Sequence, residues 1–473
     1  MNKEHLGISQ QTLVSNNGNQ IVPSKKLPQY IASLTATLGA LAIGTTLGWT
    51  SPAGDNGKNL QTLYGINISA EEFSWMSSIG AIGSAVICIP TGILADILGR
   101  KYTMLLLVIP FTIGWLLIIF ANSVLMFYIG RFITGIGSGA FSVVIPIYIA
   151  EIAESSIRGT LGSYFQLLLT VGILLTYVLG PLVNMRILSI ICAIEVLIFF
   201  GIFVFMPESP IFYLKKGTEN SARKSLIRLR GAQYNIENEL QEHKEALMEN
   251  SENTARFWTV MKSKTTLKSF IIGYGLMFFQ QTCGINVVIF YTTSIFEKAG
   301  SSLNADESTM IVGLLQVIAV FVSSLIVDRA GRKVLLLTSI LSLCLTSCTL
   351  GLYFYLLEIN QDVSTIMWLP LASMCIYIVM FNMGFGPLPW LVMSEIFAPE
   401  IKGIAASSTC LFNCILVFII TKYFNNVSQA IGIGETFWLF SVFCIVGAFF
   451  VYFIVPETKG RTLEEIQKDL IDS

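Results

Sequence analysis

The chain has 473 residues, of which 53% are apolar and only 12% are charged, and its mean hydropathy is +0.69. This composition excludes an ordinary soluble globular protein and indicates a chain whose natural solvent is lipid. The formal net charge of -1 gives no sign of a nucleic-acid partner.

Twelve apolar stretches follow one another along the chain. A helix crosses about 30 Å of hydrocarbon with about 20 residues, because each residue rises about 1.5 Å. We therefore predict an all-α membrane protein with twelve transmembrane helices. The predicted spans are 30–51, 73–95, 102–121, 126–150, 161–184, 185–206, 268–293, 308–328, 333–357, 367–391, 404–423 and 435–455.

A single large polar insertion divides these spans into two sets of six. Part of it, 221–230, has the pattern of a short amphipathic helix. The predicted organisation is an N-terminal tail at 1–28, a six-helix half at 29–206, a helical linker at 207–267, a second half at 268–456 and a C-terminal tail at 457–473.

The positions of the cations predict the orientation. If the N-terminus is cytoplasmic, four of the 29 Lys and Arg residues fall in external loops, namely Lys58, Arg186, Lys298 and Lys422. Positive charge gathers on the cytoplasmic side of membrane proteins, so we expect both tails to be cytoplasmic, and we expect a plasma-membrane protein. Asn67 and Asn426 begin glycosylation sequons in loops that this rule places outside.

Three charged motifs occur in the same order in both halves. Asp96-x-x-Gly-Arg-Lys recurs as Asp328-x-x-Gly-Arg-Lys, Glu151 and Glu395 are each followed seven residues later by a cation and Gly, and Pro-Glu closes the sixth and twelfth spans. Two repeated halves are typical of transporters that rock around a midplane site. We expect charge pairs among these residues to form a cytoplasmic gate, the alternative being charges that only set topology. The gate residues are Asp96, Gly99, Arg100, Lys101, Glu151, Arg158, Glu208, Asp328, Gly331, Arg332, Lys333, Glu395, Lys402 and Glu457.

Span seven carries Gln280, Gln281 and Asn286 in otherwise apolar sequence. On an unbroken helix Gln280 and Asn286 would point about 240° apart, so we predict a break near Gly284. Neutral amides at membrane depth, together with an aromatic ring, suit an uncharged polyhydroxylated ligand, the alternative being hydrogen bonds between helices alone. The candidate substrate-binding residues are Gln166, Gln280, Gln281, Asn286, Gln316, Trp390 and Asn413.

Together these motifs resemble the sugar porter family of the major facilitator superfamily. The resemblance rests on Gly130-Arg131, Pro146-x-Tyr148 with Glu151 and Arg158-Gly159, Pro207-Glu208-Ser209-Pro210, Gln280-Gln281 with Gly284-Ile285-Asn286, and Pro456-Glu457-Thr458. Gly48-Trp49-Thr50-Ser51-Pro52 is most similar to the insect trehalose branch, near animal facilitative glucose transporters. The resemblance implies sugar contacts at Gln166, Gln280, Gln281, Asn286, Trp390 and Asn413. Departures at Asn382, Gln316, Cys414 and Phe290 concern the sugar site, and Ile211 departs at the cytoplasmic charge cluster.

Span one contains no Asp, Glu, Lys, Arg or His, which favours facilitated diffusion of trehalose or a hexose over proton coupling. An alternative is a proton-coupled symporter that uses Glu195 in span six, with Arg131 as its partner. An alternative of another class is a sugar receptor that does not transport. We expect no enzymatic activity, cofactor or metal, and only a neutral sugar and the lipid bilayer as partners.

Overall fold

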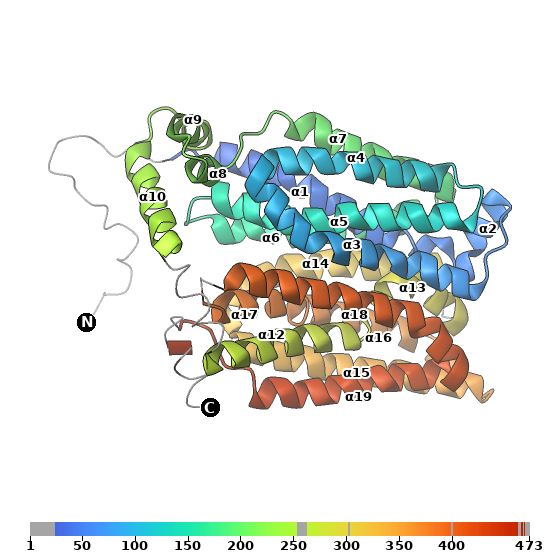
Figure 1. Cartoon of the computed structure of the whole chain (residues 1–473). Helices are drawn as coiled ribbons and strands as arrows, with labels where there is room; N and C mark the ends of the chain where they lie inside the picture. Colours follow the sequence, from blue (N-terminus) through green and yellow to red (C-terminus); the bar gives the residue numbers. More distant parts are fainter. Residues whose placement is uncertain are drawn as a thin grey trace, which may run out of the picture.

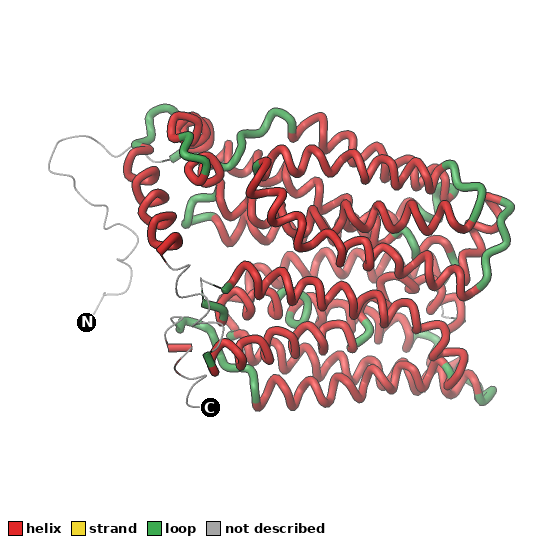
Figure 2. Tube along the Cα trace, viewed as in Figure 1, coloured by secondary structure: helices red, strands yellow, loops and turns green. Residues whose placement is uncertain are grey.

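The computed structural model describes residues 24–252, 263–300, 303–398 and 401–461, with 465, 466 and 468. Within helices, the side chains of residues 249–252, 328–330 and 402 lie outside the described set. All regular structure in these ranges is helical (Figures 1 and 2).

All twelve predicted spans are confirmed as helices long and apolar enough to cross a membrane. The first six spans are α1 (Leu27–Gly48), α3 (Ala70–Leu98), α4 (Arg100–Ile119), α5 (Val124–Ile152), α6 (Arg158–Leu179) and α7 (Met185–Phe203). The last six are α12 (Lys264–Thr282) with α13 (Ile285–Ala299), α14 (Ala305–Ala330), α15 (Arg332–Glu358), α16 (Leu369–Met383) with α17 (Leu388–Ile396), α18 (Lys402–Ile431) and α19 (Ile433–Phe453). The shorter helices are η1 (Ser51–Ala53), η2 (Asp55–Gly57), α2 (Lys58–Tyr64), α8 (Pro210–Lys215), α9 (Glu219–Arg230), α10 (Ile236–Glu252) and η4 (Ser364–Ile366).

The spans form two packed halves that meet along two helix pairs. In the first half α3 and α4 pack on α5 and α1 packs on α6, and in the second half α15 packs on α16 and α19. Across the halves, α3 lies against α18 and α6 lies against α14 (Figure 1). Helices α8, α9 and α10 gather at one end of the bundle, which we call the linker end, and α2 lies at the opposite, far end (Figure 1).

The predicted break in span seven is confirmed. Helix α12 ends at Thr282 and α13 begins at Ile285, and Gly284 between them has φ +94°. Side chains rarely adopt this conformation, and a Cβ at Gly284 would lie 2.7 Å from the Phe440 ring. Span ten is broken as well, because α16 ends at Met383 and α17 resumes at Leu388 after two glycines and a proline.

Direct contacts between the halves close the far end of the bundle. Ser51 Oγ lies 2.9 Å from Thr293 Oγ1, and the Tyr177 hydroxyl donates to the Ile289 carbonyl at 2.7 Å. Near the same end, Lys298 Nζ lies 3.2 Å from Asp55 Oδ1. These contacts join broken span seven to the first half.

The two sequons lie in different surroundings. Asn67 is exposed in the loop between α2 and α3, as expected. Asn426 is exposed but lies within α18, so its predicted loop position is wrong. The segment after Lys422 has no Gly or Pro before Gly432, and the helix therefore continues to Ile431.

Candidate functional site

Four of the predicted substrate-binding amides meet at the break in span seven. Gln280 and Gln281 lie in the last turn of α12, Asn286 lies in the first turn of α13, and Asn413 comes from α18. Asn413 Nδ2 donates to Gln280 Oε1 at 2.9 Å, Gln281 Nε2 donates to Asn413 Oδ1 at 3.1 Å, and Asn286 Nδ2 donates to Gln281 Oε1 at 2.5 Å. We call these four residues the amide chain.

One end of the amide chain is anchored to the broken span ten. Gln280 Nε2 donates to the carbonyls of Phe385 and Gly386 at 2.8 and 3.0 Å. A helix break leaves carbonyls without intrahelical partners, and Gln280 satisfies two of them. Both N–H groups of Gln280 are therefore committed to the protein.

The other end of the amide chain retains capacity for a ligand. A primary amide offers two N–H donors and two acceptor lone pairs. Among the described residues, Asn286 uses one N–H and leaves its Oδ1 without a hydrogen bond, and Gln281 uses one N–H. Asn286 is half-buried, whereas Gln280 and Gln281 are buried. A neutral hydroxylated molecule could thus exchange hydrogen bonds at Asn286.

The other three predicted sugar contacts lie on separate helices. Gln166 is half-buried on α6, Gln316 is 3% exposed on α14, and Trp390 is 40% exposed on α17. Within the described ranges, none of the three hydrogen-bonds to the amide chain. Trp390 follows Gly386, whose carbonyl accepts from Gln280, by four residues.

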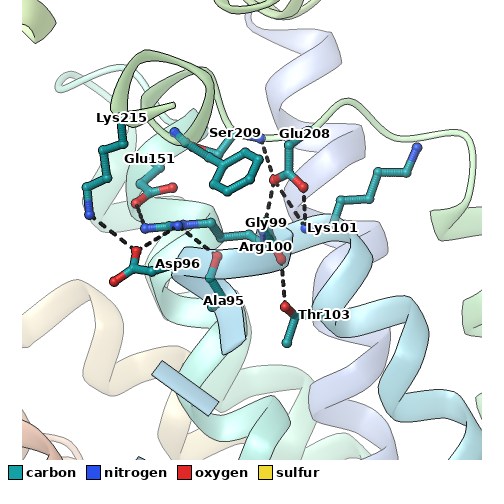
Figure 3. A network of polar contacts seen from close by, with 11 residues as sticks. Ala95, Asp96, Gly99, Arg100, Lys101, Thr103, Glu151, Glu208, Ser209 and Lys215 are labelled. Atoms are coloured by element: carbon teal, nitrogen blue, oxygen red, sulfur yellow. Dashed lines mark hydrogen bonds and ion pairs between the residues drawn. The ribbon is translucent and has the colours of Figure 1, made fainter. Parts of the chain in front are cut away.

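At the linker end, the first half contains a dense set of charge contacts, which we call the Arg100 network (Figure 3). Arg100 contacts Asp96 at 2.9 Å and Glu151 at 2.8 Å, and its Nη1 also donates to the Ala95 carbonyl at 2.9 Å. Lys215 of α8 lies 3.3 Å from Asp96. The network therefore ties α3, α4, α5 and α8 together.

Glu208 completes this network by capping the start of α4. Its carboxylate accepts from the backbone N–H groups of Arg100 at 3.0 Å, Lys101 at 3.0 and 3.1 Å, and Ser209 at 2.8 Å (Figure 3). A carboxylate is favourable there because helix N-termini carry unpaired N–H groups and partial positive charge. Burial raises the pKa of Glu208 above its ordinary 4.5, although these hydrogen bonds act in the opposite direction.

The second half repeats the arrangement as the Arg332 network. Arg332 Nη2 lies 3.3 Å from Glu395 Oε1, and Glu457 accepts from the N–H groups of Arg332 at 2.9 Å and Lys333 at 3.0 Å. Burial alone would raise the pKa of Glu457, but hydrogen bonds from the Lys459, Arg332, Lys333 and Thr458 N–H groups outweigh it and hold the pKa below 4.5.

For several predicted gate residues the structure describes no charge pair of the side chain. Lys101 and Lys333 contribute backbone N–H groups to the two caps. Arg158 is exposed and donates to the Ala153 carbonyl at 3.5 Å, instead of pairing with Glu151. The side chains of Asp328 and Lys402 lie outside the described residues.

The expected pair between Arg131 and Glu195 is not formed. Arg131 donates to the carbonyls of Thr46 at 2.8 Å and Met76 at 3.3 Å, and its guanidinium lies 5.4 Å from the Trp49 ring centroid. These partners satisfy the cation inside the first half. Neither carboxylate oxygen of Glu195 has a partner in good hydrogen-bond geometry in the described part of the chain, although the Thr45 hydroxyl lies close enough to interact with the carboxylate.

The buried cation Arg230, at the end of α9, was not singled out from the sequence. It is 1% exposed, contacts Glu239 of α10 at 2.6 Å and donates to the Ile152 carbonyl at the end of α5 at 2.9 Å. The signal was present, because a cation at the end of an amphipathic helix precedes a helix rich in Glu. Arg230 thus fastens the linker helices to the first half.

Comparison with known proteins gives consistent matches over almost the whole chain. Residues 31–470 match the family model described as "Sugar (and other) transporter". The facilitated trehalose transporter Tret1 of Polypedilum vanderplanki is 40% identical over 447 residues, which cover 94% of this chain and 88% of that protein. Tret1 of Bombyx mori is 39% identical over 442 residues, which cover 93% and 86%.

Solved structures of a bacterial transporter share the fold. The inward open xylose transporter XylE from E. coli superposes with a TM-score of 0.77 and 26% identity, covering 92% of this chain and 98% of that chain. The proton:xylose symporter XylE bound to 6-bromo-6-deoxy-D-glucose has a TM-score of 0.76 and 26% identity, covering 93% and 99%.

Proposed function

We propose that the chain, which belongs to the sugar transporter family of the major facilitator superfamily, carries a neutral sugar across the plasma membrane by facilitated diffusion. The observation that carries the proposal is the amide chain at the break of span seven. The end of the amide chain at Asn286 has N–H and C=O groups that no described residue uses. Such neutral donors and acceptors suit the hydroxyl groups of a sugar and give no advantage to an ion. The matched trehalose transporters make trehalose the first candidate and a hexose the second.

In the proposed cycle the two halves rock around the amide chain. The far end is closed by contacts such as Ser51 with Thr293, and these contacts must break for that end to open. At the linker end the Arg100 and Arg332 networks each lie within one half, so they hold each half rigid while it moves. If the linker end is cytoplasmic, we expect the closed far end to leave the site reachable from the cell interior. We expect binding and release of sugar, and no chemical reaction.

The test is uptake and competition in proteoliposomes with radiolabelled trehalose, glucose and fructose. Asn286→Ala should weaken binding of the sugar that is transported by about 1 to 3 kcal/mol, as expected when a buried polar partner is lost. Gln280→Ala should weaken binding as well, because it releases Asn413 and the carbonyls of span ten. Wild-type affinity in the Asn286 variant would remove this residue from the site, and binding without countertransport of labelled sugar would favour a receptor.

Proton-coupled transport through Glu195 is a second candidate. The observation that favours it is that, among the described residues, no cation and no well-formed hydrogen bond meets either carboxylate oxygen, although the Thr45 hydroxyl is close by. An intramembrane acid without such a partner is costly unless it is protonated or functional. A pH gradient should then drive accumulation of sugar above the external concentration, and Glu195→Gln should abolish it. Equal concentrations on both sides, with or without the gradient, would reject proton coupling and support facilitated diffusion.

A further inference from the structure

Three cysteines from opposite halves of the bundle meet where α3 packs on α18. Cys88 comes from α3, and Cys410 and Cys414 lie one helical turn apart on α18. Their sulfur atoms all lie within 4.8 Å of one another, and Cys88 Sγ is 3.5 Å from Cys410 Sγ. The sequence suggests only small packing residues at these positions, because Cys88 is more than 300 residues away from its partners.

We propose that Cys88, Cys410 and Cys414 form a binding site for a thiophilic metal cation that joins the two halves and arrests transport when it is occupied. Thiolate sulfur prefers soft cations over Mg²⁺ or Ca²⁺. Among the described residues, none of the three thiols hydrogen-bonds to the amide chain, although Cys414 directly follows Asn413. The site is therefore additional to the amide chain.

The spacing of the three sulfur atoms fits a shared ion. Sulfur ligands lie about 2.3 Å from an ion such as Zn²⁺, which puts three of them about 4 Å apart in a trigonal arrangement. The present separations of up to 4.8 Å need only a small side-chain adjustment to reach that geometry. Cys88 Sγ already lies 3.0 Å from the Ser84 carbonyl, which holds its side chain at the helix surface.

Charge balance suits a divalent cation at this depth. When two of the thiols release their protons to water, two thiolates neutralise the cation, and the third cysteine can add a neutral sulfur. A neutral complex avoids the cost of a net charge inside the bilayer. Cys88 is fully buried, whereas Cys410 and Cys414 retain exposed surface through which an ion can enter.

The position of the site explains why occupation would arrest transport. Helices α3 and α18 pack over a long seam, because Asn425 donates to Ser74 at 2.9 Å about 21 Å along α3 from Cys88. Rocking of the halves must shift α3 relative to α18, and a metal bound to both would resist that shift. Asn413, a member of the amide chain, neighbours Cys414 on the same helix.

The experiment uses the purified full-length protein and Cd²⁺ as the probe. Cd²⁺ should produce an ultraviolet thiolate-to-cadmium absorption band at one ion per protein, raise the temperature of unfolding and inhibit sugar uptake in proteoliposomes, with reversal by a chelator. Cys88→Ser should lower the Cd²⁺ affinity at least about tenfold and remove the inhibition. Cys410→Ser with Cys414→Ser should do the same.

Cys375→Ser and Cys348→Ser are the matched controls, because both are cysteines that are not fully buried and lie away from the cluster. These variants should bind Cd²⁺ and lose uptake as the wild type does. The absorption band and the shift in unfolding temperature need no transport, so they test the site even if a variant is inactive. Equal Cd²⁺ affinity in the wild type and Cys88→Ser, or undiminished uptake at saturating Cd²⁺, would overturn the proposal.

Discussion

The Arg100 and Arg332 networks contain the same kinds of residue, one Arg and two Glu, but their side chains differ in burial. In each, an Arg at the start of one span meets a Glu near the end of the next span, and a second Glu caps the same helix start. In the first half the side chains of Arg100 and Glu151 are 4% and 12% exposed, whereas those of Arg332 and Glu395 are 11% and 24% exposed. The ion pair is also shorter in the first half.

This difference shows that a repeated motif does not fix the strength of its contacts. Linker helices α8 and α9 cover the Arg100 network, because Lys215 contacts Asp96 and Ser225 Oγ donates to the Glu208 carbonyl at 2.5 Å. The carboxylates of the Arg100 network are therefore less accessible to water than those of the Arg332 network. Burial is also why the pKa of Glu208 is raised while that of Glu457 is lowered.

Removal of each arginine should give the largest difference in stability loss between the two halves. Arg100→Ala leaves the Glu151 carboxylate, whose side chain is only 12% exposed, without this partner, and we expect a loss of about 3 kcal/mol in stability. Arg332→Ala should cost about 1 kcal/mol, because its pair is longer and more exposed. Thermal unfolding in detergent measures both, with Arg158→Ala as an exposed control. Equal losses for the two variants would show that burial does not govern these networks.

Substitution of the glycine that precedes each arginine should give a smaller difference in stability loss between the two halves. Gly99 and Gly331 have φ +101° and +89°, so Ala is strained at both positions. A Cβ at Gly99 would also lie 2.4 Å from Oε2 of Glu208, whose carboxylate accepts from the backbone N–H groups of Arg100, Lys101 and Ser209, whereas at Gly331 the nearest atom of Glu457 lies 3.1 Å away. We expect losses of about 2 kcal/mol for Gly99→Ala and about 1 kcal/mol for Gly331→Ala.

The same unfolding assay checks the glycine variants, with Gly159→Ala as a control in open space. A Gly331→Ala variant less stable than Gly99→Ala would contradict the packing difference.

The smallest expected effect is on pH dependence. Glu457 has a lowered pKa, so its contribution to stability is present above pH 4.5 and is lost as the pH falls through its folded pKa. Glu208 has a raised pKa, so the folded state gains stability as the pH falls toward 4.5. The advantage of the wild type over Glu457→Gln should therefore shrink in acid, and its advantage over Glu208→Gln should grow.

These pH effects should stay below about 1 kcal/mol and are read from unfolding temperatures between about pH 7 and pH 3, a range that extends below the ordinary Glu pKa of 4.5. Parallel pH profiles for the two variants would show that the two caps share one environment.

The architecture could be predicted from the sequence because bilayer thickness dictates a local signal, about 20 apolar residues, that needs no knowledge of packing. The break at Gly284 was predictable for the same reason, since helical geometry alone sets Gln280 and Asn286 apart. Family and sugar specificity class followed from motifs that lie in order along the chain.

Contacts between distant residues could not be read from local patterns. Asn413 joins Gln280 across 133 positions, and Arg131 satisfies backbone carbonyls instead of the acid that charge matching suggested. Every residue has a backbone carbonyl, so the sequence does not indicate which carbonyl a distant side chain such as that of Arg131 will bind. Asn426 was misplaced because hydropathy falls before the helix ends.

The buried Arg230 gives the insertion a mechanical role in the transport cycle. Arg230 contacts both Glu239 of α10 and the Ile152 carbonyl of α5. We therefore expect α10 to move together with the first half. A fluorescent dye on α10 would then act as a tracer for that half, and its separation from a second dye at the linker end of α15 would follow each turnover in real time.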